Sequence, residues 1–525
     1  MNKSSVYCES EGEKEKQRGQ LVTVLSRKQI YIMEKENTQK LSKTKFAKLK
    51  EKILAIDTNH VKIFLPAKLC YFGFEASLGC IIPFLTVFLT SIGLSVTQSS
   101  LIAGFRTVAS LILSPFLNAI ADRTNRHKTI LLLEIVATIS VALPLPWIAQ
   151  TLDETLATKN VTVGNGTEVE NNLSPTSSWI LFTVMLLLTS FLSVLFMSTA
   201  GFLDSAIMSL VAKHKSKTTF GNQRVFGSIG VASGSFFSGL LSDKFHLPEV
   251  SRYSPVFFVL LPHFLILFIA ALFLTHSPVK PKKVLPKAFK RYDTFDEGEV
   301  EGSLSGKSVL QSTLSVCKQW EVIFVFIITV NNGINYATIP GFLSMHLTSI
   351  GSSRTEMGLA ASIASISAVV AFPISSRIMN LLGGAFPAFV VATFSYAVRY
   401  LIMGIVKIPS IIIAVQTLHS FGFALFWVAL VEYIHKVSPL KICTTMFGIV
   451  NTLYYSLGIL IGNIFGGMIF ARYGGEVLFQ VLSITSLIMS CFILIYHCIE
   501  KRRRKNTEVN GFLKNGKNNE IFEHI

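Results

Sequence analysis

Long apolar stretches, separated by short polar or charged breaks, recur along the chain from about residue 63 onwards. Each is near the length of about 20 residues that an α-helix needs to cross a hydrocarbon core. An open strand would leave its backbone polar groups unpaired in lipid, so helices are the expected elements. The pattern predicts twelve spans, at residues 63–90, 98–120, 129–150, 179–208, 224–242, 255–276, 321–345, 355–379, 384–406, 409–435, 442–470 and 475–498.

An internal repeat divides this pattern into two related parts. PFLTVFLTSIGLSVTQ is matched by PGFLSMHLTSIGSSRTE, so that LTSIG recurs 258 residues later, and the same offset places Pro115 on Pro373 and Asp122 on Asn380. Parallel repeats of six helices, with a site between them, are typical of transporters. We therefore expect a cytosolic N-terminal tail (1–61), a six-helix bundle (62–276), a cytosolic linker (277–319), a second six-helix bundle (320–499) and a cytosolic C-terminal tail (500–525).

Composition agrees with a polytopic membrane protein. Half of the residues are apolar and 15% are charged, whereas soluble chains carry about a quarter charged residues. The net charge of +17 is concentrated outside the apolar runs, with 14 of the 48 Lys and Arg before Leu65 and seven after Glu500. No basic face with interleaved aromatic residues is visible, so nucleic acid is not an expected partner. The seven cysteines form neither a disulfide framework nor a zinc-site spacing.

Loop charges predict the orientation. No signal peptide is visible, and the loops assigned to the cytosol carry 18 Lys and Arg against six in the opposite loops. The longest opposite loop holds three glycosylation sequons, at Asn160, Asn165 and Asn172, which are usable only on the luminal side. We expect both termini in the cytosol and a multi-pass glycoprotein in the plasma membrane or an endomembrane of a eukaryotic cell.

A cluster of charged residues separates the second and third spans, in the segment NAIADRTNRHK at 118–128. Asp122 is placed there to pair with basic groups when an inner gate closes. The segment resembles the loop signature of the major facilitator superfamily, with Asn118 and Asn125 in place of its two glycines. Asp122, Arg123, His127 and Lys128 match in kind, which assigns Asp122, Arg123 and Lys128 to the gate. The alternative is an ordinary positively charged inner loop.

Within that superfamily the chain most resembles the animal branch called major facilitator superfamily domain-containing protein six, which is similar to bacterial sugar and nucleoside proton symporters. The resemblance covers about residues 62–498. It rests on TSIGLSVTQSSLIAGFR, FGNQRVFGSIG, ARYGG and QTLHSFGFALFW, and Phe226 stands where tryptophan is expected. It implies an all-α membrane protein with the major facilitator fold, twelve helices in two pseudo-symmetric six-helix bundles, and secondary transport.

Charges inside the spans are candidates for function, because an ionised group in hydrocarbon is costly. These are Glu75, Arg106, Glu134, Asp204, Arg399, His419 and Glu432. Glu75 and Arg106 lie near the midplane of adjacent spans, so we predict that they form an ion pair and that Glu75 couples protons to transport. Glu134 and Glu432 are expected at the cytosolic surface. His419 is a candidate proton carrier or a hydrogen-bonding packing residue.

Polar residues near the middle of two later spans are candidates for solute binding. They are Asn331, Asn332, Asn335 and Tyr336 in the seventh span, and Asn451 with Tyr455 in the eleventh. Hydrogen bonding between helices is the alternative role. Glycines in the fifth and eleventh spans, Gly230, Gly234, Gly458, Gly462 and Gly466, are predicted to be close-packing seams.

No phosphate-binding loop, metal-ligand cluster or nucleophile with its base is present in the sequence, so neither an enzyme nor a cofactor is expected. The sequence predicts a secondary transporter that moves a small polar solute by alternating access, with protons as a candidate coupling ion. The alternative is a membrane receptor or interaction protein that keeps the fold without the transport cycle. The midplane charges favour transport, and the two missing glycines favour the receptor.

Overall fold

The computed structural model describes residues 58–124, 126–156, 175–213, 220–245, 253–274, 306–439 and 442–522. The following contacts lie within the compact unit Pro66–Ile525. We call residues 66–274 the N half and residues 306–503 the C half. Throughout the described ranges the regular elements are helices.

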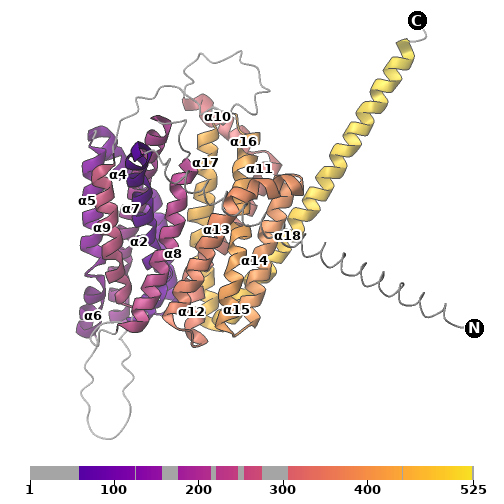
Figure 1. Cartoon of the computed structure of the whole chain (residues 1–525). Coiled ribbons are helices and arrows are strands. Elements are labelled where there is room, and N and C mark those ends of the chain that lie inside the picture. The colour runs from indigo at the N-terminus through magenta and orange to yellow at the C-terminus, as the bar shows by residue number, and fades with distance from the viewer. Residues whose placement is uncertain are drawn as a thin grey trace, which may run out of the picture. The chain divides into compact units, whose positions relative to one another are not determined.

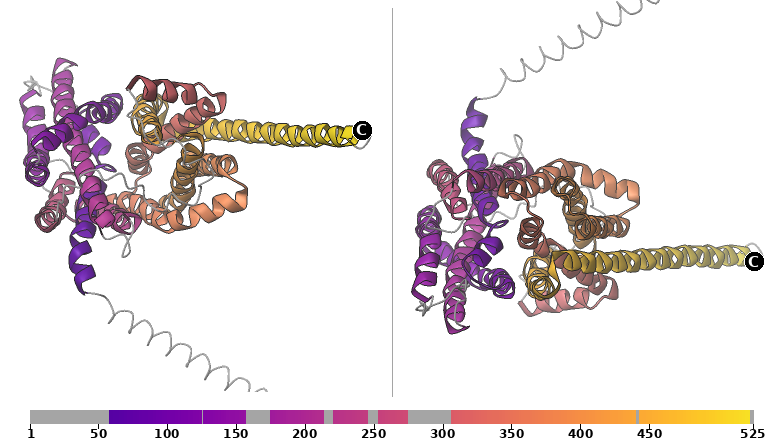
Figure 2. Two further views of the ribbon diagram at one scale, coloured as in Figure 1. Left: turned by 90° about the horizontal axis from the view of Figure 1, so that it is seen from above. Right: turned by 90° about the horizontal axis from the view of Figure 1, so that it is seen from below.

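The N half contains α2 (Thr58–Ile81), α3 (Leu85–Ser91), α4 (Val96–Thr124), α5 (His127–Ala142), α6 (Leu145–Leu156), α7 (Pro175–Lys213), α8 (Phe220–Lys244) and α9 (Pro255–Phe273). The C half contains α10 (Gly306–Cys317), α11 (Trp320–Thr338), α12 (Pro340–Ser349), α13 (Arg354–Leu382), α14 (Ala385–Ile405), α15 (Pro409–Ala414), η2 (Val415–Leu418), η3 (Ser420–Leu425), α16 (Phe426–Val437), α17 (Cys443–Thr452), η4 (Leu453–Gly458) and α18 (Ile459–Phe522). The helices of the N half and those of the C half stand side by side (Figure 1). They remain two distinct groups when the molecule is seen from above and from below (Figure 2).

The repeat is visible in the backbone. α4 and α13 are both 29 residues long and begin 258 positions apart, at Val96 and Arg354. Each is preceded by a glycine with positive φ, 91° at Gly93 and 81° at Gly351, a conformation that other residues rarely adopt. A serine and a residue three positions later cap each helix reciprocally, Ser95 with Gln98 and Ser353 with Glu356.

Proline explains a break that the apolar pattern did not predict. The first expected span divides into α2 and α3 around Pro83, and the seventh divides into α11 and α12 at Pro340. Proline has no backbone N–H to donate inside a helix, so it interrupts the hydrogen-bond ladder. The breaks fall in corresponding places in the two halves. We call the end of the molecule that holds Gly93 and Gly351 the LTSIG end.

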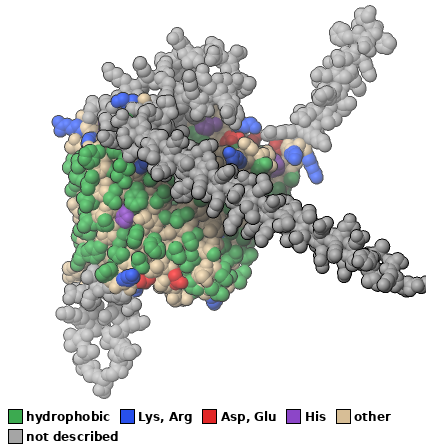
Figure 3. Space-filling view, in the orientation of Figure 1, with side chains coloured by type: hydrophobic (Ala, Val, Ile, Leu, Met, Phe, Trp, Pro, Cys, Tyr) green, Lys and Arg blue, Asp and Glu red, His purple; other side chains and the backbone are tan. Residues whose placement is uncertain are grey.

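Among the described residues, ten helical stretches are long and apolar enough to cross a membrane, or eleven if the bent pair α10 and α11 counts as one span. One stretch, Thr445–Arg503, covers two of the expected spans, and α18 is interrupted there at Gly474, which has φ 81° and ψ 177°. The number twelve therefore stays a prediction. Hydrophobic side chains cover the sides of the bundle, and Lys and Arg gather towards its ends (Figure 3).

The predicted glycine seams are confirmed. An added Cβ at Gly458 would lie 2.7 Å from the Cα of Gly333, and one at Gly462 would lie 2.8 Å from the carbonyl oxygen of Ile334. Gly466 similarly packs against Phe342, and Gly230 and Gly234 pack against the backbone of α2. Helices α11 and α18 therefore approach closely in the C half, as α2 and α8 do in the N half.

Parts of the predicted organisation differ or lie outside the described residues. The predicted linker contains a helix, α10, and the predicted C-terminal tail continues α18 as far as Phe522. The sequons at Asn160, Asn165 and Asn172 lie outside the described residues, as does most of the N-terminal tail.

Candidate functional site

Four polar side chains from three helices of the N half gather in one cluster. The Tyr71 hydroxyl of α2 donates to Asp204 Oδ1 of α7 at 2.5 Å, and Arg224 Nη1 of α8 lies 3.7 Å from Asp204 Oδ2. Glu75, one turn beyond Tyr71 on α2, interacts electrostatically with both Arg224 and Asp204. The Arg224 and Asp204 side chains are 57% and 39% exposed, so this cluster is open to small polar molecules.

A glycine positions Glu75. An added Cβ at Gly227 of α8 would lie 2.7 Å from Glu75 Cγ, so only glycine lets the Glu75 side chain cross the face of α8. Within the described residues, no hydrogen bond and no ion pair within 4.0 Å ends on the Glu75 carboxylate. Its oxygens are therefore available to a solute or a proton.

The C half presents an aromatic wall, made of the half-buried side chains Tyr336, Phe423, Trp427 and Tyr455. The Tyr336 ring lies 5.4 Å from Phe423 and 5.9 Å from Tyr455, and Trp427 lies 5.5 Å from Tyr455, measured between ring centroids. These separations are those of favourable aromatic pairs. The wall can stack on a flat part of a solute, and its two phenols add hydrogen-bonding groups.

The cluster and the wall belong to different halves but are close enough to interact electrostatically. Glu75 interacts electrostatically with the phenols of Tyr336 and Tyr455, and Arg224 also interacts with Tyr455. We call these residues together the central site: Tyr71, Glu75, Asp204, Arg224, Tyr336, Phe423, Trp427 and Tyr455. Two π-helical segments, η3 and η4, carry Phe423 and Tyr455 into it. Such segments are frequent at functional sites.

Arg399 of α14 lies behind the aromatic wall and is fully buried. Its Nε donates to Gln416 Oε1 at 3.1 Å, and its Nη1 donates to His419 Nδ1 at 3.3 Å. A guanidinium can only donate, so His419 Nδ1 accepts and its ring proton resides on Nε2. His419 also stacks on Phe423 at 5.3 Å. This arrangement favours the hydrogen-bonding role of His419 over proton carriage.

The predicted asparagine patch is divided. Asn332 and Asn335 are buried in the C half, where Asn332 Nδ2 donates to Ile328 O at 2.9 Å and Asn335 Oδ1 accepts from Ser486 at 3.1 Å. The bond of Asn335 joins α11 to α18, whereas that of Asn332 to Ile328 stays within α11. Asn331 is half-buried, and Asn451 is exposed and donates to Phe447 O. Of the six predicted binding residues, Tyr336 and Tyr455 are the ones in the central site.

Two sequence predictions about charge are corrected. The predicted ion pair between Glu75 and Arg106 is absent within the described residues: Glu75 faces Arg224, and Arg106 Nε is buried with no hydrogen-bond partner. Glu134 is not at the surface, because it is 5% exposed and lies between helices of the N half. Glu432 is exposed, as predicted.

The predicted gate residues lie where α4 ends and α5 begins. The Asp122 side chain lies outside the described residues, and Arg123 is exposed. Lys128 Nζ donates to the carbonyl oxygen of Leu272 at 2.5 Å, near the C-terminal end of α9, where carbonyl groups lack helical partners. This contact attaches the loop to the N half itself.

A clamp that the sequence pattern does not predict joins the two halves at the LTSIG end. Asp243, at the end of α8, accepts from the backbone N–H groups of Arg354 and Thr355 at 3.1 and 2.7 Å, and from the Thr355 hydroxyl at 2.6 Å. Arg354 also forms an ion pair with Asp243 at 3.5 Å. A carboxylate at a helix N-terminus meets unpaired N–H groups and the positive end of the dipole, so Asp243 holds α13 against α8.

Close packing surrounds this clamp. The Ser362 hydroxyl of α13 donates to Ala232 O of α8 at 2.7 Å. An added Cβ at Gly239 of α8 would meet the backbone of Arg354, and one at Gly358 of α13 would meet the backbone of Ser235. The two halves therefore touch backbone to backbone near the LTSIG end.

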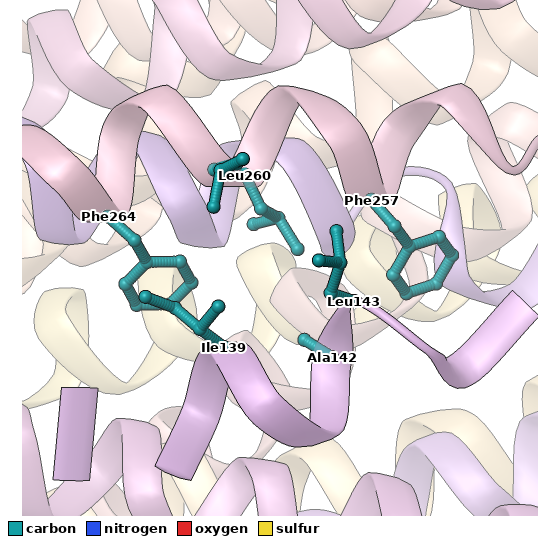
Figure 4. Close-up of a pocket in the computed structure, with 7 residues that line it drawn as sticks. Ile139, Ala142, Leu143, Phe257, Leu260 and Phe264 are labelled. Carbon is teal, nitrogen blue, oxygen red and sulfur yellow. The ribbon is translucent and has the colours of Figure 1, made fainter. Parts of the chain in front are cut away.

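A small apolar pocket lies elsewhere, between α5 with the turn that follows it and α9. Figure 4 shows Ile139, Leu143, Phe257, Leu260 and Phe264 around it. Its walls are hydrocarbon, and a polar solute would find no hydrogen-bond partner there. The central site suits such a solute better.

Comparison with known proteins gives the same fold. The chain is 22% identical over 344 residues to major facilitator superfamily domain-containing protein 6-like protein A of Xenopus laevis, an alignment that covers 65% of this chain and 52% of the relative. The chain thus spans about half the length of that relative. A crystal structure of a mutant of the nucleoside transporter NupG matches with a TM-score of 0.61 and 14% identity over 82% of this chain and 99% of the other.

A bacterial homologue of the human lysosomal transporter Spinster, solved in an inward-facing and unoccupied conformation, matches with a TM-score of 0.51 and 13% identity over 83% of this chain and 95% of the other. The model of the MFS_1 like family matches residues 64–481. These findings confirm the predicted fold class and the resemblance read from the sequence. The chain therefore belongs to the MFS_1 like family and is an integral, multi-pass membrane protein with the all-α fold of the major facilitator transporters.

Proposed function

We propose that this protein is a secondary transporter that moves a small polar solute by alternating access of the central site to the two sides of the membrane. The observation that carries the proposal is that Glu75, on the N half, is close enough to Tyr336 and Tyr455, on the C half, to interact electrostatically with both. A solute bound there contacts both halves. Movement of one half against the other then changes the side from which the solute is reached.

The present conformation supports this cycle. The Asp243 clamp closes the LTSIG end, whereas Arg224 and Asp204, towards the other end, are partly exposed. A site that is closed on one side and open on the other is one state of an alternating-access cycle. The second state requires the clamp to open.

Orientation is part of the proposal. The loop charges and the three sequons support an orientation with the LTSIG end outside and both termini in the cytosol, in the plasma membrane or an endomembrane. The conformation is then inward-facing. The same assignment gives the tails, bundles and linker the boundaries predicted from the sequence, with Asp122, Arg123 and Lys128 at the cytosolic gate.

The chemistry of the central site supports a polar solute that also has a flat or apolar face. Glu75 and Asp204 accept hydrogen bonds, Arg224 donates them, and the aromatic wall stacks. Glu75 is the group that we assign to proton coupling, because no described residue forms a hydrogen bond with its carboxylate and Arg224, which interacts with it electrostatically, can compete with a proton for it. Asp204 is already held by Tyr71 and Arg224.

The test uses the purified full chain in vesicles loaded with a mixture of small molecules extracted from cells. Mass spectrometry then compares the solutes retained after a pH gradient is imposed. We expect at least one solute to move in the wild type and not in Glu75→Gln, whereas Glu432→Gln, an exposed control, behaves as the wild type. If no solute distinguishes the wild type from protein-free vesicles, transport is not its function and the receptor alternative remains.

A further inference from the structure

Glu134 is a buried acid outside the central site. It lies on α5 about 10 Å from the start of that helix, and its side chain is 5% exposed. Helices α4, α7 and α9 pack against α5. The carboxyl group is therefore enclosed by the N half rather than by solvent.

Two hydroxyl groups of α7 hold this carboxyl. Ser198 Oγ lies 2.6 Å from Glu134 Oε1, and Thr199 Oγ1 lies 3.2 Å from Oε2. Ser198 Oγ also lies 3.1 Å from Asn118 Oδ1 of α4. A serine hydroxyl has one proton to donate, and here two oxygen atoms compete for it.

No cation compensates the carboxyl group within the described residues. The titratable or charged side chains described on the surrounding helices are Arg106 and Arg123 on α4, His127 and Lys128 on α5, Asp204 and Lys213 on α7, and His263 on α9, and Glu134 forms an ion pair with none of them. His263 Nδ1 is 2.7 Å from Val259 O, and Asp204 is held by Tyr71 and Arg224. An ionised Glu134 would be a buried charge without a counter-ion, which is costly.

When the Glu134 carboxyl is protonated, each of the oxygen atoms in this group takes part in a hydrogen bond. Glu134 Oε1–H donates to Ser198 Oγ, Ser198 donates to Asn118 Oδ1, and Thr199 donates to Glu134 Oε2. When the proton leaves, Ser198 turns its own proton to Glu134, and Asn118 must present its Nδ2–H to Ser198 instead of Oδ1. Gly201 has no side chain to obstruct the Asn118 amide, since an added Cβ there would lie 2.9 Å from Nδ2.

We propose that Glu134 is a proton-binding site of the N half, distinct from Glu75, and that the Asn118 amide transmits its occupancy to the end of α4. Asn118 is the first residue of the NAIADRTNRHK segment, six residues before α4 ends at Thr124. Proton binding at Glu134 thus selects between two hydrogen-bond arrangements where α4, α5 and α7 meet. The state of that junction then depends on pH.

Infrared difference spectroscopy of the full chain tests the site without any need for transport, so its failure is distinguishable from failure of the proposed function. We expect a protonated carboxylic C=O band that titrates with pH, disappears in Glu134→Gln and persists in the exposed control Glu432→Gln. An unchanged set of carboxylic bands in Glu134→Gln overturns the proposal.

If Glu134→Gln does not fold, Ser198→Ala serves in its place. That variant keeps the acid but removes the acceptor of its proton, so the C=O band should shift to higher frequency. An unshifted band contradicts the proposed hydrogen bond.

A maleimide label at Thr124→Cys, at the exposed end of α4, tests whether Asn118 transmits the proton occupancy of Glu134 to that end. Because the thiolate is the form that reacts, the labelling rate is divided at each pH by that of free cysteine. This ratio should depend on pH in the wild-type background, and this dependence should be lost in both Glu134→Gln and Asn118→Ala. The Asn118→Ala protein should nevertheless keep the Glu134 infrared band. pH-dependent labelling that survives in either variant shows that Asn118 does not transmit the proton state.

Discussion

The two ends of the helix bundle differ in how the halves meet. At the LTSIG end, Asp243 binds the first residues of α13, and glycines let the α8 and α13 backbones touch. Towards the other end, Arg224 Nη1 lies 3.7 Å from Asp204 Oδ2, and both side chains are partly exposed. Charges at the first end join the two halves, whereas Asp204 and Arg224 belong to one half.

This difference distinguishes a latch from a binding site. Asp243 has its acceptors filled by backbone and side-chain donors, so little of its hydrogen-bonding capacity remains for a ligand. The Glu75 carboxylate accepts no hydrogen bond from the residues that the structure describes. A transporter needs both kinds of group, one to hold a conformation and one to hold the solute, and the two are separated along the bundle.

Removal of the latch should have the largest effect. In Asp243→Ala the α13 N-terminus loses three accepted hydrogen bonds and an ion pair, with charge-assisted bonds worth about 1.5–3 kcal/mol each. The LTSIG end should open, so that a cysteine at the buried position Ser235 reacts rapidly with maleimide. Asp243→Asn, which keeps an acceptor but not the charge, should be intermediate. Equal protection of Ser235→Cys in all three backgrounds would show that Asp243 is not the latch.

A methyl group added in the same interface should also open the LTSIG end, but to a smaller extent than the loss of Asp243. The added atoms of Gly358→Ala would meet the backbone of Ser235, so the halves must separate slightly. Reactivity of Ser235→Cys should rise less than in Asp243→Ala. Gly448→Ala, at a glycine with open space around it, is the matched control and should change nothing. If Ser235→Cys reacts no faster in Gly358→Ala than in Gly448→Ala, the halves are not closely packed at this end.

Displacement of Glu75 without loss of its charge should weaken solute binding moderately. In Gly227→Ala the new methyl group would lie 2.7 Å from Glu75 Cγ and would move that side chain. The apparent KM for the solute identified in the vesicle assay should rise, while Ser235→Cys protection stays unchanged. A normal KM would place Glu75 outside the binding site.

The smallest effect concerns the repeated helix caps. Loss of an N-cap serine costs about 1 kcal/mol. α4 relies on Ser95, whereas α13 has Asp243 in addition to Ser353. Ser95→Ala should therefore lower the thermal unfolding temperature more than Ser353→Ala does. The opposite order would mean that the clamp does not support the α13 N-terminus.

The sequence predicted the fold better than the site. Apolar length and the LTSIG repeat predict helices and the shared register of α4 and α13, because both depend on local pattern. Arg224 stands at the first residue of the predicted span 224–242, where hydropathy does not distinguish a loop charge from one inside the bundle, since its span boundaries are uncertain by several residues. The Asp243 clamp and the π-helical segments depend on contacts across helices, which periodicity does not report.

Paired spin labels at both ends test alternating access most directly. One pair, at Phe245 and Thr348, spans the halves at the LTSIG end, and another, at Lys213 and Lys436, spans them at the opposite end; all four positions are exposed. The native cysteines are replaced, and distances are measured in vesicles with and without Asp243→Ala. Our account predicts that the first distance lengthens while the second shortens. Distances that stay fixed, or that lengthen together, contradict alternating access.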